Sequence, residues 1–206
     1  MTTPPSQVPL PRTRMPFANG IAQSIAQWYE HELGWATANW ATAEGLPAQG
    51  PVQLLTGLRF DVLELPSDAG FAVLRRLRGL TGPVALLGRR MRLLVAAGSA
   101  EELPGLLDWL EWGGVALDLR AIGAGGRMAA PTPPGWTSSQ GAAMWLRPPE
   151  PRHEVEPMLP AFAGLGCRAE TPDLVRLVGT AATECHRARL LHSNFADANA
   201  QPLAFS

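Results

Sequence analysis

Lysine is absent from this sequence. All 17 basic side chains are arginines, and 18 acidic side chains leave a net charge of −1. This near-balance excludes a strong overall basic field for nucleic acid. Together with abundant alanine, glycine and proline, the absence indicates a GC-rich genome. Any contact with an anion must come from individual arginines, whose planar guanidinium suits bidentate phosphate binding.

Cysteine is also scarce. Cys167 and Cys185 fit neither a zinc pattern nor a disulfide framework, so each is predicted to be a buried thiol. The four histidines lie far apart in the sequence, which does not favour a metal site. No apolar run approaches the ~20 residues that span a bilayer, and the amino terminus lacks the apolar core of a signal peptide. We therefore expect a cytoplasmic protein with no membrane partner.

The patterns that are present predict an α+β fold with helices flanking and following a group of strands. Helical spacing predicts helices over 17–33, 68–79, 99–114 and 172–192. Apolar runs predict two short strands over 52–66 that pivot near Gly57, and single strands over 35–41, 83–88, 90–98, 115–122, 126–131 and 142–150. Helix 68–79 is expected to bury Phe71, Leu74 and Leu77. Ser99 and Glu102 have the spacing of a capping box.

Composition divides the chain into four segments. Residues 1–16, with five prolines, are expected to be a disordered lead, and 17–150 to form one domain. Residues 151–171 are expected to be a linker, and 172–206 a carboxy-terminal helix and tail. Trp109 and Trp112 are three apart on a helix, which favours a core ridge. The glycine-rich stretch 123–126 lacks the Lys-Ser/Thr of a phosphate loop and is expected to connect two strands.

Several motifs occur in an order that is typical of one family. They are Gly34-Trp35 after the first helix, Thr56-Gly57 before a strand with Glu64, Gly88 to Met91, and Asp118-Leu119-Arg120 followed by Gly125-Gly126 and the prolines at 131, 133 and 134. In this order the chain resembles the amino-terminal domain of bifunctional DNA primase/polymerases, the prim-pol family, over residues 18 to 147. It looks especially like compact prim-pol-like proteins of high-GC bacteria that carry no helicase part.

The resemblance implies a prim-pol-like mixed or antiparallel sheet and a metal-dependent nucleotidyl transfer that uses three carboxylates and two divalent ions. Glu64 falls on the first carboxylate position and Asp118 on the third, but Pro66 falls on the second and offers no ligand. The family's phosphate-contacting histidine aligns with Met91, whose thioether cannot donate a hydrogen bond. Glu64 and Asp118 are therefore interpreted as remnants of a catalytic site.

A second acidic residue, Asp61, lies on the same predicted strand as Glu64. Two carboxylates on a strand share a face only at i and i+2 spacing, because side chains alternate. Asp61 and Glu64 are three apart, so a regular strand sends them to opposite faces, and only a bulge could bring them together. The pair is not expected to form a two-metal site.

Three arginines remain as candidates for nucleotide or phosphate binding: Arg90, Arg92 and Arg120. Arg90 and Arg92 share one strand face at i+2 spacing, with a solvated strand face as the alternative. Arg120 could face a phosphate or form a local salt bridge with Asp118. Trp136 and Trp145 are expected to be partly exposed, where they could stack on single-stranded bases or contact a protein partner.

The sequence therefore predicts a prim-pol-like protein with degraded catalytic motifs that binds nucleotide or single-stranded nucleic acid without catalysis and without a cofactor. A scaffold that reuses the fold for a protein partner or for self-association is the alternative. An active DNA primase/polymerase that uses Mg²⁺ or Mn²⁺ is the second alternative. Near-zero net charge and the candidate exposed tryptophans favour the scaffold over the polymerase.

Overall fold

A computed structural model describes residues 16–38, 50–151, 158–162 and 173–200. The expected lead, most of the expected linker and Cys167 lie outside the described residues. The described elements occur in the order α1 (Pro16–Glu32), β1 (Thr37–Ala38), β2 (Gln53–Leu55), β3 (Phe60–Pro66), α2 (Ser67–Leu77), β4 (Val84–Leu87), β5 (Arg90–Ala96), α3 (Ser99–Trp109), β6 (Arg120–Ile122), β7 (Arg127–Ala129), β8 (Met144–Arg147) and α4 (Leu174–Ala200). The fold is α+β, as predicted.

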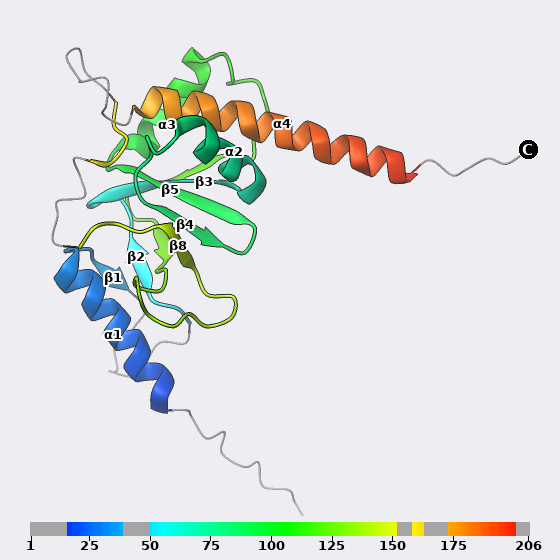
Figure 1. Cartoon of the computed structure of the whole chain (residues 1–206). Helices are drawn as coiled ribbons and strands as arrows, with labels where there is room; N and C mark the ends of the chain where they lie inside the picture. The colour runs from blue at the N-terminus through cyan, green and yellow to red at the C-terminus, as the bar shows by residue number, and fades with distance from the viewer. Residues whose placement is uncertain (1–15, 39–49, 152–157, 163–172, 201–206) are drawn as a thin grey trace, which may run out of the picture.

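The strands form two antiparallel sheets. The larger sheet has the strand order β6-β3-β5-β4-β8, and the smaller has the order β1-β2-β7. Helices α2, α3 and α4 lie on one side of the larger sheet, and α1 lies beside the smaller sheet (Figure 1). Among the described residues, no helix combines the length and apolar character needed to cross a bilayer.

Residues 123–126 connect β6 of the larger sheet to β7 of the smaller sheet, as the glycine-rich stretch predicted. The turn is closed by a hydrogen bond from the Gly126 amide to the Gly123 carbonyl, at 3.0 Å. The buried Thr56 hydroxyl donates to the same carbonyl, at 2.6 Å. Gly57 packs so closely on this turn that a Cβ at position 57 would lie 2.2 Å from Ala124 Cα. The sheets are thus joined at a tightly packed corner.

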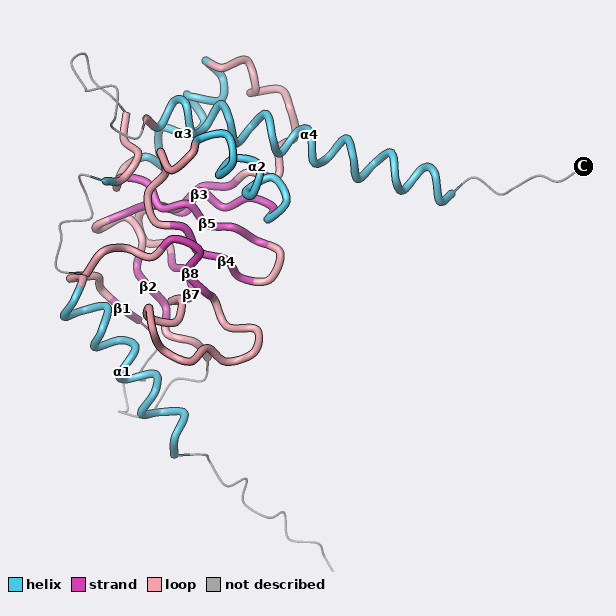
Figure 2. The backbone as a smooth tube through the Cα atoms, viewed as in Figure 1, coloured by secondary structure: helices cyan, strands magenta, loops and turns pink. Residues whose placement is uncertain are grey.

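Each face of the larger sheet covers its own apolar core, because side chains alternate along the strands. On β3, Leu63 and Leu65 belong to the core under α2, α3 and α4. Phe60 and Val62 belong to the second core, which includes Tyr29 of α1. The backbone trace in Figure 2 shows the strands between α1 on one side and α2, α3 and α4 on the other. This alternation decides which face each polar residue of β3 occupies.

Helix α4 begins on the first core and then extends past the sheet (Figures 1 and 2). Its buried residues lie in its first half and are Leu174, Leu177, Val178, Ala181, Ala182, Glu184 and Cys185. From Arg187 to Ser193, the described side chains are exposed except for Ala188, which is half-buried. The predicted carboxy-terminal helix is present.

Two expected core positions on helices are wrong. Phe71 is 41% exposed, because α2 turns Gly70, Val73 and Leu77 toward the sheet instead. At Gly70, Met91 of β5 approaches so closely that a Cβ would lie 2.4 Å from its sulfur, so this missing side chain sets the buried face. Trp109 is 71% exposed at the end of α3.

Two local predictions near the strands are also corrected. Gly98, and not Ser99, occupies the N-cap position of α3, and no cap side chain there makes a hydrogen bond. The strand expected over 115–122 is limited to β6, which starts at Arg120. Only these three residues of the range pair with β3, because the preceding segment leaves the sheet edge beside α4.

Candidate functional site

Register brings the predicted site residues onto neighbouring strands. Glu64 of β3 lies opposite Arg92 of β5 on one side and opposite Arg120 of β6 on the other. Pro66 lies opposite Arg90 of β5. Because Glu64 alternates with Leu63 and Leu65, Glu64 and the residues opposite it belong to the sheet face that does not carry α2, α3 and α4. Arg90 is the first residue of β5, and from this strand end its side chain also reaches a pocket that residues of α2 and α4 line. Residues from three separate parts of the sequence thus meet on one face.

The two arginines of β5 hold the two carboxylates. The Nε of Arg92 donates to Oε2 of Glu64 at 2.9 Å, and the Nε of Arg90 lies 3.3 Å from Oε1 of the same carboxylate. The Nη1 of Arg90 donates to Oδ2 of Asp118 at 2.7 Å. One guanidinium, that of Arg90, therefore bridges Glu64 and Asp118, and a second covers the other oxygen of Glu64.

The bridge is partly shielded from water. The side chains of Glu64 and Arg92 are each 13% exposed, that of Arg90 is 27% exposed, and that of Asp118 is 52% exposed. Burial alone would lower the pKa of Arg90, but hydrogen bonds and charge interactions with Asp118 and Glu64 outweigh it and raise that pKa above its ordinary value. The bridging group is therefore a permanent cation.

Two buried guanidinium atoms of this cluster have no hydrogen-bond partner among the described residues. They are Nη2 of Arg90 and Nη1 of Arg92. Arg120 is exposed, and its side chain makes no hydrogen bond or ion pair to a described residue. The local Asp118–Arg120 pair considered as an alternative is not formed within this part of the chain, because Asp118 pairs with Arg90. Arg120 therefore offers an accessible donor for a further anion.

A pocket of about 330 Å³ opens beside the bridge. It is lined by Arg90 and Asp118, by Ser67 and Asp68 at the start of α2, and by residues of α4 that include Arg189. Arg189 is fixed by a hydrogen bond from its Nη1 to the Ala116 carbonyl. Sequence reasoning missed the contribution of α4, because no motif links this helix to the strands.

Cys185 also lines this pocket, but its thiol is not reactive. Its side chain is buried, and its sulfur lies 3.8 Å from the Asp118 carbonyl oxygen. Burial, with a smaller contribution from the charge of Asp118, raises the pKa of Cys185 to about 12. A protonated thiol is a poor nucleophile. The prediction of a buried thiol is confirmed for Cys185.

Asp61 lies on the opposite sheet face from Glu64, as its spacing predicted. It is 1% exposed, and its Oδ2 accepts a hydrogen bond from the Ala100 amide at 2.9 Å. Ala100 is the second residue of α3, so Asp61 caps this helix from a neighbouring strand. Within the described ranges, no group of His, Cys, Asp and Glu side chains has an arrangement suited to a metal ion.

The two candidate stacking tryptophans have different surroundings. Trp136 is 43% exposed in the loop before β8. Trp145 is only partly exposed and packs on the core that contains Tyr29. Its indole N–H donates to the Tyr29 hydroxyl at 2.9 Å, and that hydroxyl donates to the Pro131 carbonyl at 2.7 Å. Trp145 therefore has a structural role in the second core, and its partial exposure agrees with the prediction, while its role in base stacking or partner contact stays a prediction.

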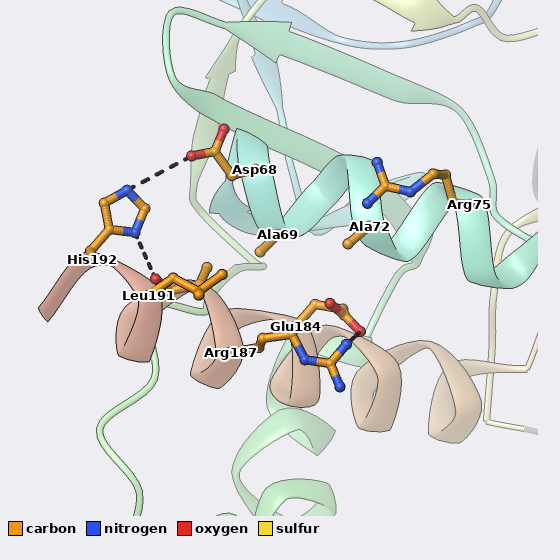
Figure 3. A pocket seen from close by; sticks show the side chains of 9 residues that line it. Asp68, Ala69, Ala72, Arg75, Glu184, Arg187, Leu191 and His192 are labelled. Atoms are coloured by element: carbon orange, nitrogen blue, oxygen red, sulfur yellow. Dashed lines mark hydrogen bonds and ion pairs between the residues drawn. The ribbon is translucent and has the colours of Figure 1, made fainter. Parts of the chain in front are cut away.

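A second hollow separates α2 from the outer half of α4 (Figure 3). Glu184 is 4% exposed there, and it forms ion pairs with Arg76 of α2 at 2.5 Å and with Arg187 at 3.3 Å. His192 lies 3.8 Å from Asp68 at the open end. Glu184 is a single acidic residue on an otherwise apolar face of α4. This pattern could have predicted the contact between α4 and α2, but the sequence reasoning did not include it.

Comparisons with protein-family models, with curated proteins and with solved structures give no match to this chain.

Proposed function

We propose that this chain is a prim-pol-like cytoplasmic protein that binds the phosphates of a nucleotide or of single-stranded nucleic acid without catalysing nucleotidyl transfer. One observation carries the proposal: the Arg90 guanidinium bridges Glu64 and Asp118. The resemblance to the prim-pol family puts Glu64 and Asp118 at the two family carboxylate positions that still carry a carboxylate in this chain. A cation that belongs to the chain thus lies between groups that would otherwise bind divalent ions.

Metal binding at this position competes with strong internal contacts. A divalent ion would have to displace Arg90 from both carboxylates, while Arg92 still holds the second oxygen of Glu64. Charge-assisted contacts of a partly buried carboxylate are costly to break, because each separated charge must be solvated again. This competition supports a non-catalytic function over the active polymerase.

Charge on this face favours an anion. Arg90, Arg92 and Arg120 supply three positive charges against the two negative charges of Glu64 and Asp118. The unpartnered nitrogens of Arg90 and Arg92 are buried, so a phosphate oxygen satisfies them only after these side chains turn toward solvent. Arg120 can approach a second phosphate without losing an internal contact. The arrangement suits a polyphosphate or two successive phosphates of a strand.

Binding is tested with a fluorescein-labelled oligothymidylate of about 20 nucleotides, followed by fluorescence anisotropy at increasing salt. Three arginine–phosphate contacts predict a slope of log affinity against log salt of about −2, so affinity falls about 20-fold between about 50 and 200 mM salt. ATP added as a competitor tests whether a mononucleotide occupies the same site. A flat salt response contradicts the proposal.

Arg120→Ala provides the sharpest variant, because its side chain has no partner among the described residues. Loss of one phosphate contact is expected to reduce the salt slope by about 0.7. Arg176→Ala is the matched control: Arg176 is also an exposed arginine, but it lies on α4, across the sheet from Arg120. Equal effects of the two substitutions would indicate general charge attraction and no site.

Primer extension separates the proposal from the active polymerase. The wild-type chain is expected to extend no primer with dNTPs and Mn²⁺. Extension by the wild type that disappears in the Glu64→Ala/Asp118→Ala variant would establish the polymerase instead. Because that variant also loses the partners of Arg90, its urea unfolding midpoint must be measured alongside.

A scaffold function is the second candidate, and exposed apolar side chains on α4 favour it. Leu190 is 50% exposed and Leu191 is 53% exposed, on the part of the helix that extends past the sheet (Figure 1). Adjacent exposed leucines on a projecting helix are typical of a contact surface. Sedimentation of the wild type and of Leu190→Asp/Leu191→Asp tests self-association, and an unchanged monomer in both removes this support.

A further inference from the structure

A groove whose described lining carries no charge lies away from the arginine cluster. It has a volume of about 410 Å³ and is formed by α1, the end of β4, part of β7 and the loop between β7 and β8. Ile21, Ile25, Leu87 and Trp136 give it apolar walls, and none of the described residues that line it carries a charged side chain. Its ligand is therefore expected to be uncharged and largely apolar.

The groove exposes both apolar surface and hydrogen-bond donors. Ile21 is 59% exposed and Trp136 is 43% exposed. The Trp136 indole and the Gln140 side-chain amide, which also line the groove, make no hydrogen bond to a described residue. An exposed tryptophan with an available N–H in an apolar groove is the arrangement that binds extended proline-rich peptides, because proline rings pack on the indole and peptide carbonyls accept its hydrogen.

The chain itself contains a segment with this chemistry. Residues 1–11 read MTTPPSQVPLP: they include four prolines, with Val8 and Leu10 between the later ones, and no charged side chain. Arg12 and Arg14 follow, so charge begins only beyond this stretch. An uncharged proline-rich peptide matches the uncharged groove, and a polyproline conformation costs such a sequence little entropy on binding.

The segment is also attached at the right place. It joins α1 at Pro16, and Ile21 in the groove lies five residues farther along this helix, a rise of about 7.5 Å. Fifteen residues in an extended polyproline conformation span about 46 Å. Residues 4–11 can therefore reach the groove from their own attachment point, at a high effective concentration.

We propose that residues 4–11 of this chain bind in the groove as an extended proline-rich ligand, with prolines packed on Trp136 and Val8 or Leu10 against Ile21. This contact is independent of the proposed anion site, since no arginine of that site lines the groove. It also gives Trp136 a peptide ligand in place of the nucleic-acid bases considered from the sequence.

Hydrogen–deuterium exchange of residues 135–143 in the full-length chain tests the proposal. The variant is Val8→Asp/Leu10→Asp, which places charge in the apolar stretch. A segment docked about 90% of the time predicts about tenfold faster exchange of this loop in the variant. Thr2→Asp/Thr13→Asp is the matched control, because it adds the same charge at polar positions outside residues 4–11, and it should leave the exchange rate near that of the wild type.

Two further measurements make each outcome decisive. A synthetic peptide of residues 1–15, added to Val8→Asp/Leu10→Asp, should restore slow exchange, and it should fail to do so when Trp136→Ala is also present. Equal exchange in wild type and variant overturns the proposal. Protection that grows with protein concentration also overturns it, because the occupant would then be the segment of a second copy.

Discussion

Asp61 should contribute to stability and not to ligand binding. Its carboxylate is 1% exposed on β3 and accepts the Ala100 amide at the start of α3, at 2.9 Å. Asp61→Ala leaves that amide without its acceptor, a loss of about 1–3 kcal/mol for a shielded donor. Asp61→Asn keeps a carbonyl oxygen for the Ala100 amide and loses the interaction of a negative charge with the helix dipole, about 0.3–1 kcal/mol. Its amide group takes the place of Oδ1, which is buried without a partner among the described residues.

Urea unfolding of both variants, followed by circular dichroism, measures this difference. We expect a loss of about 2 kcal/mol for Asp61→Ala, which corresponds to about 4–8 °C in Tm for a chain of this size, and less than half of that loss for Asp61→Asn. Glu101→Ala removes an exposed carboxylate from the first turn of the same helix and should cost little. Equal losses in the two Asp61 variants, or a change in oligothymidylate binding, would refute the capping role.

Two other features lead to direct predictions. Gly57 has φ +86° and lies against Ala124, so Gly57→Ala should cost more than about 2 kcal/mol in urea unfolding, whereas Gly141→Ala, with φ +78° but open space, should cost about 1 kcal/mol. Burial raises the pKa of Cys185 to about 12, so iodoacetamide at neutral pH should alkylate it far more slowly in the folded chain than in urea. Because the pKa of Cys185 is higher in the folded chain than in the unfolded chain, its contribution to the free energy of unfolding is fully present below pH 9 and is lost between pH 9 and 12. Equal alkylation rates of Cys185 in the folded chain and in urea would contradict the raised pKa and this pH dependence.

Local sequence periodicity was sufficient to predict that the two acidic residues of β3 lie on different faces of the sheet. Alternation along β3 predicts that Asp61 and Glu64 occupy opposite faces, and the structure confirms this. Alternation also placed Arg90 and Arg92 on one face of β5, and both contact Glu64. These predictions succeeded because they depend only on the two-residue repeat of a single strand.

Contacts between distant segments could not be read in this way. The Arg90–Asp118 pair depends on how β6 and its preceding residues meet β5 across β3, and no spacing within either segment encodes that distance. The buried face of α2 depends on the approach of Met91 to Gly70, so periodicity alone misplaced Phe71. The prediction that Trp109 belongs to the core was wrong because α3 ends at this residue. Helical spacing does not indicate where a helix leaves the core.

Pro66 belongs to two elements of the fold, so a substitution at this position affects both. It is the last residue of β3, opposite Arg90, and it is also the N-cap residue of α2. Aspartate is among the most favourable N-cap residues, so the carboxylate in Pro66→Asp would be drawn to the amide hydrogens of the first turn of α2. A metal-binding carboxylate at position 66 therefore requires that α2 begin at another residue. The substitution Pro66→Asp alone would stabilise the start of α2 and would not supply a metal ligand.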